Sequence, residues 1–183
     1  MTNPDCSGRP PRCPPWRTLN EIAAGGPATL DRIAAAVNAA RRTAWAGIVS
    51  RHGGLPGVQI ADRVLDGVSC IRVDATVTVA HSDKEWAEPN FKGFGHHPLL
   101  SHCDNTDEPL AAMMRRGGAG SNTTADHIAI VDASIAALPP TYRRRLMVTT
   151  DAAGASHGLI AHLDGVGPPA RPPVDLLGGL GHP

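Results

Sequence analysis

Residues 70–85 read CIRVDATVTVAHSDKE, and apolar and polar side chains alternate from Ile71 to Val79. The alternation predicts a β-strand over 70–80 with one buried and one exposed face, because successive side chains of a strand point to opposite sides of its sheet. Asp74 lies on the exposed face, although strands are depleted in aspartate. It is therefore either a solvated position or a carboxylate that the strand holds for a function.

The rest of the sequence predicts a mixed α/β fold. Helical segments show apolar residues three and four positions apart, and strands show alternation between turn residues. The other expected elements, in chain order, are a helix over 29–50, strands over 96–103 and 108–115, a helix over 123–138, a strand over 146–151 and a short helix over 156–163. This order is typical of a mixed sheet that is covered by helices.

The two long helices carry the clearest local signals. The first has Thr29 as its expected cap and an apolar stripe that consists of Leu30, Ile33, Val37, Ala40, Ala44 and Ile48. In the second, Thr123 and Asp126 match a capping box. Its expected buried stripe consists of Ile128, Val131, Ile135 and Leu138.

Composition narrows the class of protein. The 183 residues carry 17 basic and 17 acidic side chains, so no overall field favours a nucleic-acid partner. The four cysteines have no zinc-finger spacing, and no segment approaches the roughly 18 apolar residues of a membrane span. We expect a soluble cytoplasmic protein without a membrane partner. Ten of the 17 prolines lie in residues 1–15 and 165–183, which are therefore expected to be disordered tails.

A second aspartate gives Asp74 a possible partner. Asp151 is the last residue of the expected strand 146–151, and ligands of open α/β sheets collect outside the carboxyl ends of strands. If the two strands are neighbours, two carboxylates meet at one edge and repel each other unless a cation such as Mg²⁺ lies between them. Two metal ions about 4 Å apart would support phosphoryl transfer. The alternative is two polar residues that face water.

Four longer motifs extend this hypothesis. They are VDATVTVAHSDKE, FGHHPLLSHCD, EPLAAMMRRGGAGSNTTADHI and VTTDAAGASHGLIAHL, in this order along the chain. Together the motifs resemble DDE-type insertion-sequence transposases of group 1, and the resemblance runs from about Trp16 to Leu163. It implies a ribonuclease-H-like fold and an enzyme that cuts and rejoins DNA with Mg²⁺ or Mn²⁺. Asp74 and Asp151 match the first and second catalytic aspartates of the family, which are also its metal ligands.

The resemblance also implies partners and a domain organisation. The expected partners are DNA at transposon ends and intact transposase subunits. The residues expected to contact DNA phosphates are Lys84, Lys92, Arg115 and Arg116, unless they form an ordinary solvated face. The expected organisation is a disordered tail over 1–15, a helical segment over 16–69, a partial ribonuclease-H-like domain over 70–164 and a second disordered tail over 165–183.

One part of the family's pattern is missing. Its third acid is a glutamate on a helix after the second aspartate, whereas only Asp164 and Asp175 follow Asp151 here. The sequence therefore resembles a family member that ends early, as a damaged or frameshifted gene would encode. The alternative to an active transposase is a catalytically inactive remnant that binds DNA weakly or interacts with other proteins.

Overall fold

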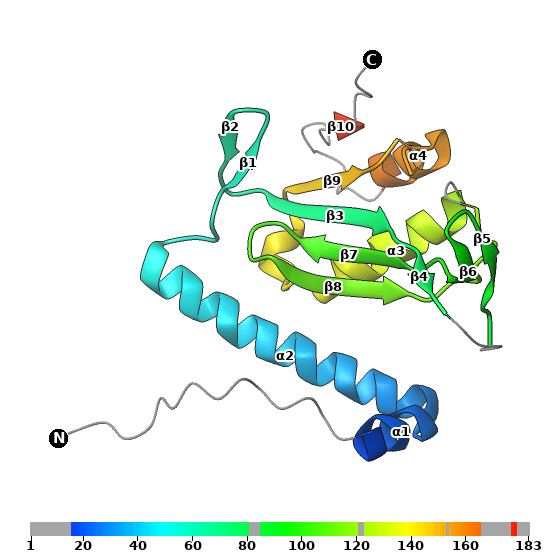
Figure 1. Ribbon diagram of the computed structural model, residues 1–183. Helices are drawn as coiled ribbons and strands as arrows, with labels where there is room; N and C mark the ends of the chain where they lie inside the picture. Colours follow the sequence, from blue (N-terminus) through cyan, green and yellow to red (C-terminus); the bar gives the residue numbers. More distant parts are fainter. Residues whose placement is uncertain (1–15, 81–84, 121–122, 153, 166–176, 179–183) are drawn as a thin grey trace. The chain divides into compact units, whose positions relative to one another are not determined.

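The computed structural model describes residues 16–80, 85–120, 123–152, 154–165 and 177–178 (Figure 1). The residues expected to form the N-terminal tail, and most of those expected to form the C-terminal tail, lie outside these ranges. The chain divides into two compact units, residues 1–40 and 41–183, which are described separately. Among the described residues, no helix combines the length and the apolar character that crossing a membrane requires.

The first unit is helical. Helix α1 spans Trp16–Ala24, and helix α2 spans Gly26–His52 and continues into the second unit. The expected helix therefore begins three residues before Thr29, whose Oγ1 donates a hydrogen bond to Gly25 O (3.0 Å) from inside the helix. The first part of the predicted apolar stripe, Leu30, Ile33 and Val37, is 57%, 39% and 50% exposed. The periodicity thus predicted the helix, but this part of the stripe is not buried.

The second unit is built on a mixed sheet, as the sequence predicts, but the sheet has five strands instead of the expected four, because Leu177–Gly178 of the expected C-terminal tail adds a strand. Its strands, in spatial order, are β10 (Leu177–Gly178), β9 (Leu146–Thr150), β3 (Ser69–Ala75), β7 (Leu99–Cys103) and β8 (Glu108–Met113). The strands β3, β7 and β8 form an antiparallel meander, and β9 is parallel to both β3 and β10. The turn between β7 and β8 is the expected DNTD segment.

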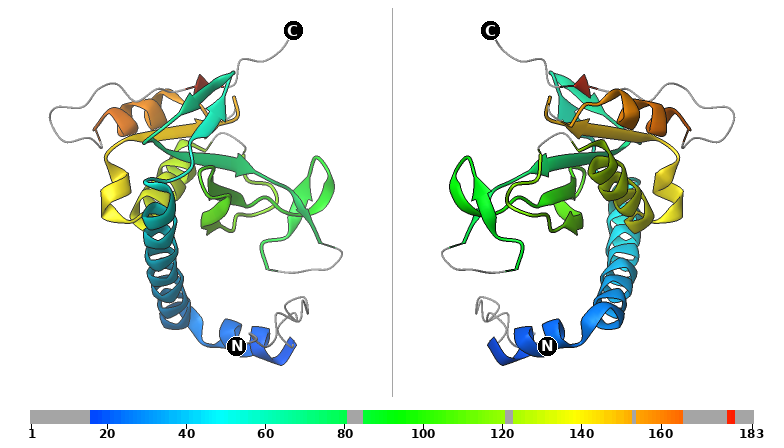
Figure 2. Two further views of the ribbon diagram at one scale, coloured as in Figure 1. Left: turned by 90° about the vertical axis from the view of Figure 1, so that its left-hand side faces the viewer. Right: turned by 90° about the vertical axis from the view of Figure 1, so that its right-hand side faces the viewer.

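Two helices cover one face of this sheet. Helix α3 (Thr124–Ala137) follows β8, and helix α4 (His157–Gly165) follows β9 and lies alongside it (Figure 2). Both contribute to the main core, which consists of Trp45, Ile71, Val73, Leu99, Cys103, Ile130, Val131, Leu138, Val148, Leu159 and Leu163. A buried hydrogen bond of 2.6 Å between Ser101 Oγ and Ser134 Oγ links β7 to α3. Helix α3, which lies between β8 and β9 in the chain, therefore packs with the sheet around one core.

The details of α3 differ from the prediction. The side that is buried centres on His127, Ile130, Val131 and Ser134, while Ile128 and Ile135 pack at its margin. Thr123 is the N-cap but makes no side-chain cap hydrogen bond. The predicted capping box is wrong because the Asp126 carboxylate accepts a hydrogen bond from Arg115 (3.2 Å) instead.

The predicted strand over 70–80 is interrupted. Strand β3 ends at Ala75, and Thr78–Val79 forms β4 of a separate three-stranded sheet with β5 (Glu88–Asn90) and β6 (Gly93–His96). The reason lies on the neighbouring strand, where Pro98 has no N–H to extend the ladder beyond the Ala75–Leu99 pair. Thr76 N donates to Pro98 O (3.1 Å), and the chain then leaves the main sheet. The same proline divides the expected strand over 96–103 into β6 and β7.

A hairpin that the sequence analysis did not predict lies at the other end of β3 (Figure 1). It consists of β1 (Val58–Ile60) and β2 (Arg63–Leu65). Its Val58 packs with Cys70 and Met147 in a second, smaller core. The face of the sheet opposite α3 is thus covered at this end of the strand.

Candidate functional site

The structure brings Asp74 and Asp151 together at one edge of the main sheet. In the parallel pairing of β3 and β9, Val73 lies beside Thr150. Continuing this register by one residue places Asp74 beside Asp151, on strands about 4.8 Å apart. Both residues are exposed. Both residues therefore lie near the carboxyl ends of adjacent parallel strands, and the meeting of their carboxylates at one metal stays a prediction.

The segment after β9 holds Asp151 in a defined turn. Asp151 Oδ1 accepts a hydrogen bond from Gly154 N (2.9 Å), and the Asp151 carbonyl accepts one from the same N–H (3.1 Å). A side chain at Gly154 would overlap Thr150 Oγ1 and crowd the His127 ring, so this close approach requires glycine. Ser156 Oγ then accepts a hydrogen bond from Leu159 N (3.2 Å) at the start of α4. The loop that carries the second carboxylate is thus fixed at both ends.

The pair fits a hard divalent cation. The Asp74 carboxylate has no hydrogen-bond or ion-pair partner within the described ranges, and the side-chain hydrogen bond of Asp151 there uses Oδ1 alone. Mg²⁺ in proteins is often held by one or two carboxylates and keeps several waters. The described part of the chain contains no cluster of three or more histidine, cysteine, aspartate or glutamate side chains that could hold a metal. A metal at this position would thus have at most these two carboxylates as described acidic ligands, and its binding stays a prediction.

The basic residues predicted to contact DNA differ in their exposure and in their partners. Arg116 is exposed and forms an ion pair of 3.0 Å with Glu88, and Lys92 is exposed in the turn between β5 and β6. Lys84 lies outside the described residues. Arg115 is 5% exposed, and its guanidinium binds His97 O, Gly120 O and the Asp126 carboxylate.

Arg115 is therefore a structural residue in this conformation, and its prediction as a phosphate contact is corrected. Its neighbour in the sequence, Arg116, remains available on the surface. The two arginines differ because α3 brings Asp126 to the Arg115 guanidinium, whereas Arg116 forms its ion pair with Glu88 at the surface. Adjacent residues on extended backbone point to opposite sides.

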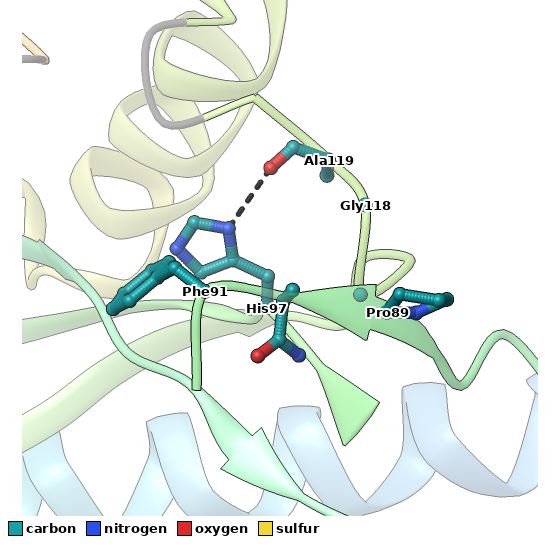
Figure 3. A pocket seen from close by; sticks show the side chains of 7 residues that line it. Pro89, Phe91, His97, Gly118 and Ala119 are labelled. Atoms are coloured by element: carbon teal, nitrogen blue, oxygen red, sulfur yellow. Dashed lines mark hydrogen bonds between the residues drawn. The ribbon is translucent and has the colours of Figure 1, made fainter. Parts of the chain in front are cut away.

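A pocket of about 280 Å³ lies next to these basic residues (Figure 3). Its lining residues are Pro89, Asn90, Phe91, His97, Gly117, Gly118 and Ala119. The His97 ring donates from Nδ1 to Ala119 O (2.9 Å), since a carbonyl can only accept, and it meets Phe91 edge to face at 6.2 Å. Sequence analysis missed this site because its two walls lie about 28 residues apart in the chain. An exposed phenylalanine beside a lysine, in a protein with only two phenylalanines, was the available signal.

Charge near the pocket is balanced by Glu88. The hydrogen bonds from Arg116 and from Gly118 N lower the pKa of the Glu88 carboxyl, in that order of importance. Glu88 is therefore ionised across the physiological range and anchors the segment after β8 to β5. Gly117 allows this approach, since a side chain there would overlap the carbonyl oxygens of Gly95 and Glu88.

The two described cysteines have no catalytic character. Burial raises the pKa of the Cys70 thiol to about 11 and also raises the pKa of Cys103. Since the thiolate is the reactive form, both side chains behave as small apolar core residues.

Comparisons with protein-family models, with curated proteins and with solved structures each find no match for this chain.

Proposed function

We propose that this chain is related to the DDE-type transposases, with a ribonuclease-H-like fold and with Asp74 and Asp151 as ligands of Mg²⁺ or Mn²⁺. The observation that carries the proposal is the parallel pairing of β3 with β9, which ends at Val73 and Thr150, one residue before each aspartate. They are the two positions that match the family's first and second catalytic acids. A solvated polar face would require no such alignment between residues 77 positions apart in the sequence.

The topology of the main sheet supports the fold assignment. The resemblance predicts three sequential strands, a crossover helix and a strand parallel to the first. Strands β3, β7 and β8, followed by α3 and β9, have this order. The additional parallel strand β10 lies on the far side of β9.

The residues suit phosphodiester chemistry. When bound, a divalent cation would lower the pKa of a water and stabilise charge on the phosphate. Asp74 and Asp151 hold and orient it from rigid strand ends, while Lys92 and Arg116 are exposed for contacts with the DNA backbone. In the intact reaction the water attacks the phosphodiester, and the released 3′-hydroxyl then attacks target DNA.

We further propose that the chain as given binds the cation weakly and cleaves no DNA by itself. Two carboxylates hold one cation, whereas the family uses a third acid. The candidate after Asp151 in the described residues is Asp164, which lies in the last turn of α4 and is exposed. This favours the second candidate function, a DNA-binding or interacting remnant, for the isolated chain.

Manganese titration tests the metal site. Mn²⁺ should broaden the amide resonances near Asp74 and Asp151, and either substitution, Asp74→Asn or Asp151→Asn, should remove the effect at both. Asp107→Asn is the matched control, because Asp107 is an exposed carboxylate in the turn after the opposite end of β7. Broadening that survives both substitutions would refute the site.

Plasmid nicking tests activity. With Mn²⁺ and supercoiled DNA, the wild-type chain should nick no faster than Asp151→Ala. If the wild type nicks and the variant does not, another acid completes the site and the remnant alternative is wrong.

A further inference from the structure

The turn between β5 and β6 presents an unusual surface. Phe91 is 78% exposed, although full burial of such a ring would contribute roughly 1.5–3 kcal/mol. The Lys92 ammonium lies 5.7 Å from the centre of the same ring. A large flat apolar group and a cation are therefore adjacent on one tight turn. A nucleotide has the complementary arrangement, because its flat base is joined through the sugar to an anionic phosphate.

The pocket behind Phe91 adds a polar group that lacks a partner. Asn90 Oδ1 accepts a hydrogen bond from Lys92 N (2.9 Å), which fixes the orientation of the amide and identifies the other atom as nitrogen. Asn90 Nδ2 is buried and has no hydrogen-bond partner among the described residues. Such a donor is costly to leave unsatisfied. Because water does not reach this nitrogen, a ligand in the pocket meets other atoms of Asn90, and the stacking surface is Phe91.

We propose that this pocket binds one unpaired nucleotide of single-stranded DNA. The base stacks on Phe91 at the mouth of the pocket, while Lys92 binds the adjacent phosphate. The proposal rests on the proposed function in taking DNA as the ligand, and it adds where an unpaired part of that DNA is held.

The geometry favours an unpaired nucleotide over duplex DNA. In a duplex the faces of each base are covered by its neighbours, so an aromatic ring stacks only on a base that has left the helix. The pocket volume of about 280 Å³ lies just below the range for small-molecule sites, which is about 300–1,000 Å³. It accommodates one base rather than several. Contact with a single phosphate by Lys92 predicts a modest salt dependence.

Fluorescence anisotropy with a labelled 20-nucleotide strand tests the proposal, in EDTA so that no metal takes part. The strand should bind more tightly than its duplex, and Phe91→Ala should weaken strand binding about tenfold, within the range for loss of one stacked base. Phe91→Trp should retain binding because it retains an aromatic face. Trp16→Ala is the matched control, since it removes a ring that is 73% exposed elsewhere in the chain.

Lys92→Gln should reduce the slope of log K against log salt by about 0.7, the value for one phosphate on a single strand. Asp74→Asn should bind the strand like wild type, so loss of the metal site and loss of this site are distinguishable. Unchanged binding by Phe91→Ala, an equal loss with Trp16→Ala, or preference for the duplex would overturn the proposal. So would full competition by a free mononucleotide at equal concentration, because the ligand would then not be a strand.

Discussion

Glu108 joins the second part of α2 to the main sheet, and Glu108→Gln tests how much that connection contributes. The carboxylate accepts hydrogen bonds from Arg41 Nε (3.0 Å), from Thr106 Oγ1 (2.8 Å) and from the indole N–H of Trp45. The Arg41 side chain is only 2% exposed, and it also donates to the carbonyl oxygens of Pro109 and Ala137. Glutamine keeps one acceptor oxygen but turns an N–H₂ toward donors, so at least one hydrogen bond is replaced by two opposed donors.

The magnitude follows from burial. Removing one partner of a buried ion pair costs about 3–5 kcal/mol. Glu108 is 27% exposed, so water offsets part of this loss, and we expect the free energy of unfolding to fall by about 2–3 kcal/mol. The corresponding fall in Tm is roughly 8 °C for a protein of this size.

Urea unfolding followed by circular dichroism measures the effect of Glu108→Gln. Asp104→Asn is the matched control, because it makes the same chemical change in the Arg72–Asp104 ion pair of 2.9 Å, whose arginine is 53% exposed. An exposed pair of this kind contributes about 0–1 kcal/mol. If the two variants lose equal stability, burial of Arg41 does not increase the contribution of Glu108 to the free energy of unfolding, and the prediction is wrong.

Three further predictions concern local structure. Ala61 and Asp62 form the two-residue turn of the β1–β2 hairpin, and both have positive φ (45° and 64°), a conformation for which Asn-Gly is preferred. The double substitution Ala61→Asn/Asp62→Gly should therefore raise the urea midpoint by the equivalent of about 1 kcal/mol. An unchanged midpoint would contradict this. The pKa of the Cys70 thiol is raised from 9.0 to about 11 on folding. The contribution of the protonated thiol to the free energy of unfolding is therefore complete below pH 9. It is lost as pH rises through about 11, at up to about 1.4 kcal/mol per pH unit. Cys70→Ala should flatten this dependence in unfolding measured from pH 8 to 11, and an identical pH profile would refute it. Gly117→Ala should destabilise the protein by about 2 kcal/mol because its Cβ would meet backbone, whereas Gly118→Ala meets only the end of the Glu88 side chain and should cost less in the same assay.

Local sequence patterns predicted the elements whose partners are close in the chain. The hairpin of β7 and β8 and the crossover helix α3 were found with small errors at their ends, because alternation, turn residues and helical spacing all act within a few residues. The alignment of Asp74 with Asp151 also followed from strand-end positions. These features depend on local chemistry and on one assumption, that the two strands are neighbours.

Features that depend on distant contacts were missed. Arg115 and Arg116 are indistinguishable in the sequence, and only the approach of α3 and its Asp126 makes the first a buried structural residue. Arg41 is a charged residue within a helix, and its burial depends on Glu108, 67 positions away. The exposed stripe of Leu30, Ile33 and Val37 shows the converse, since periodicity predicts a helix but not what covers it.

Pro98 explains why the strand predicted over 70–80 ends early, and the early end affects the position of Asp74. Had β3 continued to residue 80, Asp74 would lie in the interior of the ladder, where ligands of α/β sheets do not collect. Because Pro98 has no N–H to donate, the pairing with β7 stops at Ala75, one residue after Asp74. On the other side, β9 stops at Thr150, one residue before Asp151. Two independent terminations thus bring Asp74 and Asp151 close to strand ends at the same edge of the sheet, and Pro98 is the residue that ends the pairing on the β7 side.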